Sequence, residues 1–422
     1  MDFFNCSICG QKFDSFMWCD SCQIQEFENN FKNWTGENEE IDYFIQQTQL
    51  KAKDFDQFIQ WMPYEGFDII KKIGQGGFSK VYEANWRDGP IWNWNSKSKK
   101  WDRNDSCKVA LKVLEGSKDS TKFLEEVSAY VECAALSVHK QTILRCYGIS
   151  QDPETRDYII VLEYMPNGNI RRYLKQNSTK CDWSFRISIL KDILHGLLTI
   201  HKRDLIHFNL HAGNILMRNN FNGRESKIVI ADIGQYGPPY HPHGDDLYGV
   251  MPYIAPEVLR GNEYTQASDI YSLGMLMYEL ISGIPPFSNR AHDQALMFDI
   301  CNGLRPEIKK NIDKIPDNFI NILRKCWDPN PFNRPSAYDL FLFDNYGELS
   351  VKNDEIFESK YEIHPGAIYT SRELSIYTQS LSQGDDEMIE WNTEKRLEVP
   401  GSNYYATKLQ NMNDEFGNNL NN

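Results

Sequence analysis

Two short stretches decide the fold: IHFNLHAGN at residues 206–214 and IADIG at residues 230–234. Asn214 and Asp232 lie in these stretches. They offer the hard oxygen ligands that Mg²⁺ takes from a protein while it keeps waters and substrate phosphates. The two residues therefore predict a magnesium site at which a phosphate-bearing molecule binds.

A glycine-rich turn, GQGGFSKV at residues 74–81, lies between two predicted strands, Phe67–Ile73 and Val81–Trp86. Glycines let the backbone approach phosphate oxygens closely and direct N–H groups at them. Glycine-rich hairpins are often no more than turns, so this motif alone carries little weight. The residues that follow it decide whether it binds phosphate.

A lysine on the next predicted strand supports the phosphate interpretation. VALK ends at Lys112 within the predicted strand Val109–Leu114, and Glu125 and Glu126 lie on the predicted helix Thr121–Leu136. A carboxylate on that helix can orient the lysine toward phosphates. A lysine among apolar neighbours could also be a surface residue whose stem covers them. The ordered set of turn, lysine and carboxylate favours the phosphate site.

Four cysteines near the N-terminus have the spacing of a metal site. Cys6-x-x-Cys9 and Cys19-x-x-Cys22 are separated by nine residues, and two such turns can complete tetrahedral Zn²⁺ coordination. A segment of 22 residues cannot bury enough apolar surface to fold alone, so the metal would supply its folding energy. Disulfides and a redox Cys-x-x-Cys are the alternatives, and the sequence has neither a leader peptide nor a βαβ pattern to favour them. With Lys12 as its one basic residue, the segment predicts a protein contact rather than nucleic acid.

The composition is that of a globular protein. The 422 residues are 41% hydrophobic and 25% charged, which excludes a collagen, a coiled-coil rod and a wholly disordered chain. The net charge of −14 argues against DNA or anionic lipid as partners. No apolar run approaches the roughly 18 residues that span a bilayer. No secretory signal is visible, so we expect a cytoplasmic or nuclear protein that is not secreted. The oligomeric state is not legible from the sequence.

Changes in composition and in the pattern of apolar residues predict four segments along the chain. These are a cysteine segment at 1–22, a helical linker at 23–66, one large α/β region at 67–346 and a polar, largely disordered tail at 347–422. Amphipathic phases predict linker helices around Ile41–Ile45 and Phe55–Ile59. An insertion at 88–107 with three tryptophans predicts a hairpin, and Ile368–Tyr369 and Leu374–Tyr377 of the tail can dock on the body. Further strands are predicted at Leu144–Ile149 and Tyr158–Glu163, and helices at Ile187–Lys202, Ile270–Ile281, Ala291–Ile300 and Phe319–Trp327.

More motifs follow in order: APE at 255–257, DIYSLG at 269–274 and NRP at 333–335. With these, the stretch from about Phe67 to Tyr346 resembles the eukaryotic protein kinase domain. YIAPE at 253–257 and CWDP at 326–329 resemble the tyrosine-kinase-like group, and the arrangement with the cysteine segment resembles a fungal expanded kinase family. The resemblance implies an α+β bilobal fold with a β-rich N-lobe and a helical C-lobe, and the cysteine segment resembles a small zinc ribbon.

The resemblance implies roles for individual residues. Lys112 would pair with the α- and β-phosphates of ATP and with Glu126, whose Phe-Leu-x-Glu context matches better than that of Glu125. Asn214 and Asp232 would hold Mg²⁺, and Asp269 would brace the catalytic loop. Glu257 and Arg334 would form a structural ion pair. The nucleotide-contacting positions would be Gly74, Gly76, Gly77, Val81, Ala110, Lys112, the gatekeeper Leu162 and the hinge residues Glu163 to Met165.

The main departure from the family pattern is Asn209, which stands where the family has the Asp that accepts the proton of the substrate hydroxyl. An amide is not a useful base at neutral pH. Phe208 replaces the Arg that reads a phosphorylated activation loop, and Val250 stands where Ser/Thr kinases usually have a Thr. His211 occupies the place of a γ-phosphate-binding lysine, and we expect a partly exposed loop histidine there, although it could act as a base.

Four functions are compatible with this pattern. The favoured one is an ATP- and Mg²⁺-binding kinase domain that is catalytically impaired and works as a signalling switch or scaffold with a protein partner. The runner-up is an active protein kinase that tolerates Asn209 and phosphorylates protein Ser, Thr or Tyr hydroxyls. A small-molecule phosphotransferase and a zinc-dependent interaction module that binds no nucleotide fit the motifs less well.

Overall fold

The computed structural model describes residues 4–6, 8–13, 18–76, 79–117, 120–134, 141–177, 181–219, 227–233, 247–308, 315–342 and 361–378. The chain divides into two compact units. The first takes in residues 1–196, 212–240 and 369–372, and the second takes in 197–211, 241–368 and 373–422. Strands dominate the N-terminal part of the first unit and helices dominate the second, which confirms the predicted α+β fold class.

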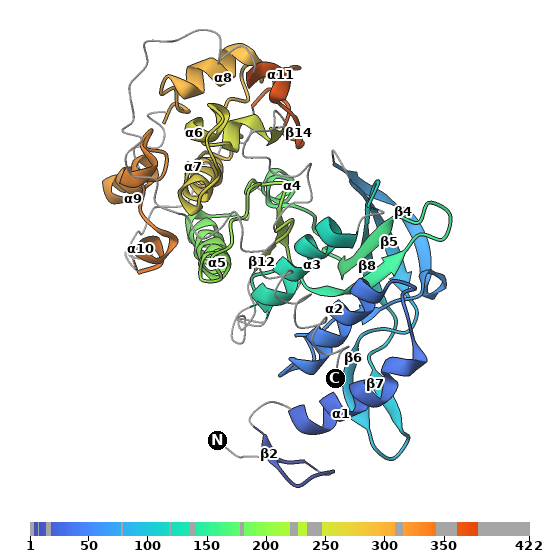
Figure 1. Cartoon of the computed structure of the whole chain (residues 1–422). Helices are drawn as coiled ribbons and strands as arrows, with labels where there is room; N and C mark the ends of the chain where they lie inside the picture. The colour runs from blue at the N-terminus through green and yellow to red at the C-terminus, as the bar shows by residue number, and fades with distance from the viewer. Residues whose placement is uncertain are drawn as a thin grey trace, which may run out of the picture. The chain divides into compact units, whose positions relative to one another are not determined.

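A six-stranded sheet organises the first unit (Figure 1). Its order is β3-β9-β10-β8-β5-β4, antiparallel throughout except that β3 runs parallel to β9. The central strands bury nearly every side chain because they are covered on both faces, whereas the edge strand β4 exposes most of its residues. The strands are β3 (Gln60–Trp61), β4 (Phe67–Gln75), β5 (Ser79–Trp86), β8 (Cys107–Leu114), β9 (Cys146–Gln151) and β10 (Tyr158–Glu163).

The strand and helix predictions in this unit are confirmed to within a few residues. Helix α3 (Ser120–Ala134) follows β8, and the short β11 (Ile215–Met217) and β12 (Ile228–Ile230) form a separate antiparallel pair. Helices α4 (Ile170–Gln176) and α5 (Trp183–His201) follow β10 and precede β11 in the chain. The cysteine segment adds the two-residue strands β1 (Phe4–Asn5) and β2 (Lys12–Phe13), which pair with each other.

The tryptophan-bearing insertion is a hairpin, as predicted. Strands β6 (Ile91–Asn95) and β7 (Lys100–Arg103) pair only with each other and form a sheet of their own rather than widening the six-stranded one. Trp94 and Trp101 meet edge to face across the hairpin with 5.1 Å between ring centroids. Such cross-strand aromatic pairs stabilise a two-stranded ribbon.

The segment between the cysteines and β4 is only partly the helical linker that the sequence predicts. Helices α1 (Asp20–Asn30) and α2 (Glu39–Leu50) are present, and Asn38 caps α2 by accepting the N–H groups of Glu40 and Ile41. The predicted helix at 55–59 is wrong. Phe58 and Ile59 are buried in a segment without regular secondary structure that leads into β3.

The buried backbone of Ile59 explains why no helix forms there. Its N–H donates to Thr48 Oγ1 (3.2 Å) and its carbonyl accepts from Gln49 Nε2 (3.0 Å), so side chains of α2 satisfy the groups that a helix would have satisfied. Residues 60 and 61 then add a strand to the sheet beside β9. The segment is thus packed into the first unit and is not a free linker.

The second unit is helical, and its longest helix, α7 (Gln266–Ser282), is buried from Ser268 to Ile281. At its start the Thr265 N–H donates to Ser268 Oγ at 3.1 Å, and Gly283 ends it in the left-handed conformation (φ 68°) that glycine adopts without strain. Further helices of this unit are α6 (Pro256–Leu259), α8 (Gln294–Cys301), α9 (Asp317–Cys326) and α10 (Ala337–Leu342). The predicted helices of this region are confirmed.

The described residues of the polar tail, Tyr361–Thr378, include the short β14 (Arg372–Glu373) and α11 (Ser375–Thr378). Docking at Ile368 and Leu374 is confirmed: Ile368 bonds to His292, and Leu374 is fully buried. Tyr369 places its ring under the guanidinium of Arg171, 4.4 Å away, within the first unit. The prediction for Ile376 is wrong, because its side chain is 65% exposed.

Among the described residues, no helix is both long and apolar enough to cross a membrane.

Candidate active site and metal centre

Lys112 lies between two carboxylates in the first unit. Its Nζ is 2.6 Å from Glu126 Oε1 on α3 and 2.8 Å from Asp232 Oδ1, which follows β12. Lys112 and Glu126 are buried, whereas the Asp232 side chain is 32% exposed. The predicted lysine–Glu126 contact is therefore present, and the sequence motif at 230–234 contributes the second carboxylate.

The charges around Lys112 keep it protonated. Burial alone would lower the pKa of Lys112, but the carboxylates of Asp232 and Glu126 outweigh burial and hold that pKa well above its ordinary value. The ammonium of Lys112 is fixed by Glu126 and Asp232, and Asp232 is partly exposed. In such an arrangement the lysine can bind phosphate oxygens and the aspartate can bind a metal ion.

Tyr130 supports Asp232 and was missed in the sequence. The backbone N–H of Asp232 donates to Tyr130 Oη at 2.8 Å, and Asp232 has the left-handed φ of 56°, which is strained for a residue with a side chain. Burial raises the pKa of Tyr130 well above its ordinary value, so the hydroxyl stays neutral. The signal was available: Tyr130 is one helical turn beyond Glu126, on the same face of α3.

Asn214 is placed beside this group by the β11–β12 pair. It is buried directly before β11, and its carbonyl accepts the N–H of Ala231 at 2.9 Å, immediately before Asp232. The two predicted metal ligands are thus carried by neighbouring segments of one hairpin-like pair. Amide and carboxylate oxygens are suitable Mg²⁺ ligands.

The register of the sheet gathers the predicted nucleotide-contacting side chains on one face. Val81 lies opposite Lys112, and Ala110 lies opposite Leu162. Residues directly opposite in antiparallel strands share a face, as do residues two apart, so all four project to the same side. Leu162 and Met165 at the end of β10 are buried, and Glu163 is half-buried and paired with Arg218 at 3.3 Å.

The glycine turn is described in part. Gly74 pairs with Val81, and the Gly76 N–H donates to the Ser79 carbonyl at 2.8 Å, so the turn closes as a hairpin between β4 and β5. A side chain at Gly76 would approach Ser79 Oγ to 3.3 Å, which is tight. Gly77, also predicted to contact the nucleotide, lies outside the described residues.

In the second unit, Asp269 holds the loop that contains Asn209. The buried Asp269 carboxylate accepts the N–H groups of His207 (2.8 Å) and Phe208 (3.2 Å), and it lies 2.9 Å from His201 Nε2. Phe208 has a φ of 68°, a strained conformation that these bonds fix. This is the bracing role that the sequence comparison implies for Asp269.

Asn209 itself is buried, and its N–H donates to His207 Nδ1 at 3.3 Å. Phe208 packs edge to face on Tyr264 with 5.3 Å between centroids, so this position is apolar where the family pattern has a cation. The prediction of a partly exposed His211 is wrong: His211 is 5% exposed, because it lies beside the buried Tyr253 with 5.9 Å between ring centroids.

Glu257 and Arg334 form the ion pair that the resemblance implies. The guanidinium binds both carboxylate oxygens, at 2.6 and 2.7 Å, and both residues are buried in the second unit. Arg334 Nη1 also donates to the carbonyl of Ala267 at 2.8 Å. Such a bidentate pair fixes the start of α7 relative to the segment that carries Glu257.

Comparison with known proteins agrees with this geometry. The profile of the family described as protein tyrosine and serine/threonine kinase matches residues 67–342. The chain belongs to the protein kinase family. A probable serine/threonine-protein kinase of Dictyostelium discoideum is 32% identical over 285 residues, and the tyrosine-protein kinase SPK-1 of Girardia tigrina is 28% identical over 284 residues.

The kinase relatives are longer than their matched parts. The Dictyostelium match covers 66% of this chain and 19% of that protein, and the match to Dictyostelium roco5 (27% identical) covers 66% and 10%. For SPK-1 the shares are 64% and 51%. What the chain shares with these proteins is the kinase domain, and that domain implies ATP and Mg²⁺ as its ligands. The residues that would hold them are those described above.

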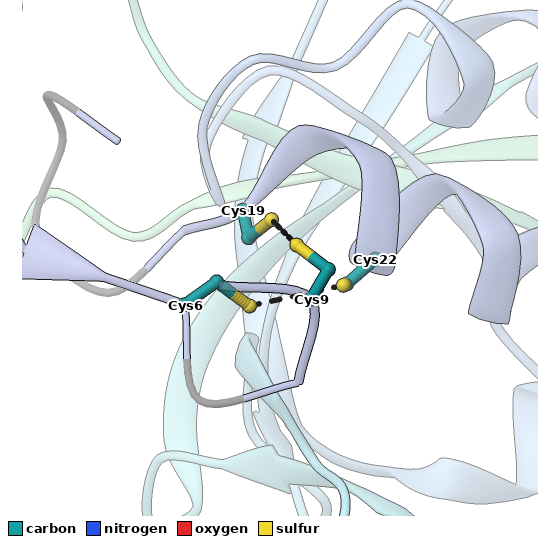
Figure 2. Close-up of side chains that lie close together, drawn as sticks. All are labelled: Cys6, Cys9, Cys19 and Cys22. Carbon is teal, nitrogen blue, oxygen red and sulfur yellow. Dashed lines mark hydrogen bonds between the residues drawn. The ribbon is translucent and has the colours of Figure 1, made fainter. Parts of the chain in front are cut away.

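The side chains of the four N-terminal cysteines lie close together (Figure 2). Cys6 Sγ lies 3.7 Å from Cys22 Sγ, Cys9 Sγ lies 3.6 Å from Cys19 Sγ, and all four sulfurs lie within 4.8 Å of one another. Zn–S bonds of about 2.3 Å in a tetrahedron place sulfurs about 3.8 Å apart. The donor set and its spacing therefore fit a tetrahedral metal ion.

Residues that flank the four cysteines attach this segment to the insertion hairpin (Figure 1). Gln23, next to Cys22, donates from Nε2 to Asn93 Oδ1 (2.9 Å) and accepts the Trp94 N–H with Oε1 (3.1 Å). Trp18, next to Cys19, is buried in an aromatic cluster and stacks on Phe58 with 5.7 Å between centroids. The cluster also contains Phe27, Ala52, Ile91 and Trp101.

Proposed function

We propose that this kinase domain binds Mg²⁺-ATP but transfers phosphate poorly, and that it acts as a signalling switch or scaffold for protein partners. The observation that carries the proposal is a contrast between two positions. Lys112, Glu126 and Asp232 lie in contact, as nucleotide binding requires, whereas Asn209 occupies the position of the catalytic base. The chain would therefore bind the nucleotide but transfer its phosphate slowly.

The chemistry of Asn209 supports impaired turnover. A general base contributes about 10²- to 10⁴-fold to a rate, and a neutral amide cannot accept the proton that leaves the substrate hydroxyl. Lys112, Asn214 and Asp232 with Mg²⁺ would still position and neutralise the phosphates, which are large parts of phosphoryl transfer. A slow residual activity is therefore compatible with the proposal.

The second candidate is an active protein kinase, because the relatives with the same domain are named as serine/threonine- or tyrosine-protein kinases. One observation favours it: His211, two residues from Asn209, is buried near Tyr253 and could serve as a base if its ring reached the substrate. If the domain is active, the phosphate acceptor would be a Ser, Thr or Tyr hydroxyl of a protein substrate.

The direct experiment compares phosphotransfer by the natural chain and by Asn209→Asp. Impaired catalysis predicts a gain in the variant, and an active kinase predicts none. A thermal-shift titration with Mg²⁺-ATP tests the shared premise, since stabilisation by the ligand follows its occupancy. Glu126→Gln, which weakens the hold on Lys112, should reduce that stabilisation.

We further propose that the cysteine cluster binds a structural Zn²⁺. The sulfur spacing supports it: Cys6 Sγ lies 3.7 Å from Cys22 Sγ, and Cys9 Sγ lies 3.6 Å from Cys19 Sγ. A thiolate is the form that binds metal. The ion would hold Trp18 and Gln23 where they contact the hairpin and its aromatic cluster.

Finer assignments remain proposals of the same kind. We assign the domain to the tyrosine-kinase-like group on its YIAPE and CWDP motifs, and relatives named as both serine/threonine and tyrosine kinases support that. The fungal family, the cytoplasmic or nuclear location and the domain limits 1–22, 23–66, 67–346 and 347–422 stay predictions from the sequence. Protein partners, rather than nucleic acid, suit the net charge of −14.

A further inference from the structure

The described part of the tail, Tyr361–Thr378, lies against two separate stretches of the second unit. The first anchor is the segment before α8. The His364 N–H donates to the Ser288 carbonyl (2.8 Å), and the His292 N–H donates to the Gly366 carbonyl (2.9 Å). Both bonds join backbone groups, so they do not depend on the side chains of the tail.

The ring of His292 completes the first anchor. Its Nε2 faces the Phe287 carbonyl at 3.2 Å, and its Nδ1 accepts the Ile368 N–H at 3.1 Å. Gly366 has to be glycine here, since a Cβ on it would lie 2.8 Å from the Cβ of Ala291. So close an approach between backbones is a property of a packed interface rather than of a loose tail.

The second anchor is Leu247, directly before β13 (Tyr248–Gly249). The Leu374 N–H donates to the Leu247 carbonyl at 2.7 Å, and the Leu247 N–H donates to Ser375 Oγ at 3.1 Å. Both backbone groups of Leu247 are thus engaged by the tail. The Leu374 side chain is fully buried, and α11, which follows it, lies beside α8 (Figure 1).

This second anchor lies next to the base position. A Cβ placed on Gly249, two residues after Leu247, would be 3.8 Å from Asn209 Oδ1 and 2.8 Å from Ile254 Cδ1. The tail therefore engages the backbone of the segment that passes directly by Asn209. An extended chain that bonds to an exposed backbone edge in this way uses main-chain bonds for affinity and a buried side chain for specificity.

We propose that residues 361–378 are a resident intramolecular ligand of the Leu247–Gly249 segment. An extended segment of a partner protein with leucine followed by serine, as in Leu374–Ser375, would have to displace it to reach the backbone beside Asn209. The proposal rests on the proposed function in one respect only, that Asn209 marks where a phosphate acceptor would lie. The docking itself requires neither nucleotide nor turnover.

The test uses a fluorescent peptide of residues 361–378 and three full-length chains: natural, Leu374→Asp and Ile376→Asp. Leu374 is fully buried and Ile376 is 65% exposed, so the two variants are matched in chemistry and differ in burial. A tethered tail acts at an effective concentration of about millimolar, so it excludes the free peptide from the natural chain. We expect the peptide to bind Leu374→Asp at least tenfold more tightly than it binds the natural chain or Ile376→Asp.

Equal binding to all three chains, or no binding to Leu374→Asp, would overturn the proposal. A second measurement covers the case in which Leu374→Asp does not fold: in the natural chain, the Leu374 amide should exchange with solvent at least a hundredfold more slowly than an unstructured amide, and fast exchange there also overturns it. Mg²⁺-ATP thermal shifts on the same proteins separate the outcomes, because a failure to bind nucleotide contradicts the proposed function and leaves peptide binding unaffected.

Discussion

Lys112 Nζ and Asp232 Oδ1 lie 2.8 Å apart although 120 residues separate them in the chain. The sheet supplies the lysine and the β11–β12 pair supplies the carboxylate, so the contact exists only when both are folded. Glu126 holds the same ammonium from α3. The kinase domain is therefore assembled for nucleotide binding with its lysine already positioned.

Glu126→Gln should weaken binding of Mg²⁺-ATP by about tenfold or more, because a hydrogen bond to a charged group contributes about 1.5–3 kcal/mol and the amide replaces it with a weaker one. Calorimetric titration of nucleotide measures the loss. Glu125→Gln is the matched control on the same helix and should leave affinity within about twofold. A larger effect at Glu125 than at Glu126 would show that the other carboxylate positions Lys112.

Nucleotide affinity should not change between about pH 7.5 and 9.5 through titration of Lys112. The folded-state pKa of Lys112 is raised above its ordinary value of 10.5, so the contribution of the charged lysine is fully present below that value and is lost only as pH rises through the folded-state pKa. Titrations at several pH values check this. A midpoint near pH 8 or 9 would mean that burial, not the two carboxylates, dominates at Lys112.

Removal of metal from the cysteine cluster should lower the thermal unfolding midpoint of the full chain and release zinc in a ratio of one per chain. The sulfurs hold the segment that carries Trp18 and Gln23, and that segment contributes to the aromatic cluster. Chelation followed by elemental analysis and calorimetry measures both effects. An unchanged midpoint with all zinc removed, or a purified chain without zinc, would count against the metal centre.

Gln23→Ala should destabilise the chain by about 1–3 kcal/mol, because Asn93 and the Trp94 N–H lose their buried partner. Gln25→Ala, at an exposed position two residues away, should cost less than about 0.5 kcal/mol. Urea unfolding followed by tryptophan fluorescence compares them. If both variants unfold like the natural chain, Gln23 does not stabilise the hairpin.

The sequence predicted the contacts of the site that are made between residues of well-defined strands, helices and motifs. Lys112 lies on a strand whose apolar neighbours set its face, and Glu126 lies on the next helix, so their contact follows from two well-defined elements. Asp269 was likewise expected to brace the Asn209 loop, and its carboxylate does accept two N–H groups of that loop. Such features repeat in any chain that has the same motifs in order.

Features that depend on distant partners were missed. Residues 55–59 have helical spacing, but Thr48 and Gln49 of α2 bond the backbone of Ile59, which therefore does not join a helix. His211 is buried by Tyr253, which lies 42 positions later in the chain, and no local pattern reveals that contact. The tail shows the same limit: its apolar residues at 374–377 predicted docking, and Leu374 is buried whereas Ile376 is exposed.

Phosphotransfer by the natural full-length chain and by Asn209→Asp tests the central claim most directly. Both are assayed with labelled Mg²⁺-ATP for autophosphorylation and for transfer to generic protein acceptors, with Lys112→Ala as the background. A restored carboxylate should raise the rate by about 10²- to 10⁴-fold while nucleotide affinity stays within a few-fold. A natural chain that already transfers phosphate as fast as Asn209→Asp would contradict the account and establish an active kinase that does not need the aspartate.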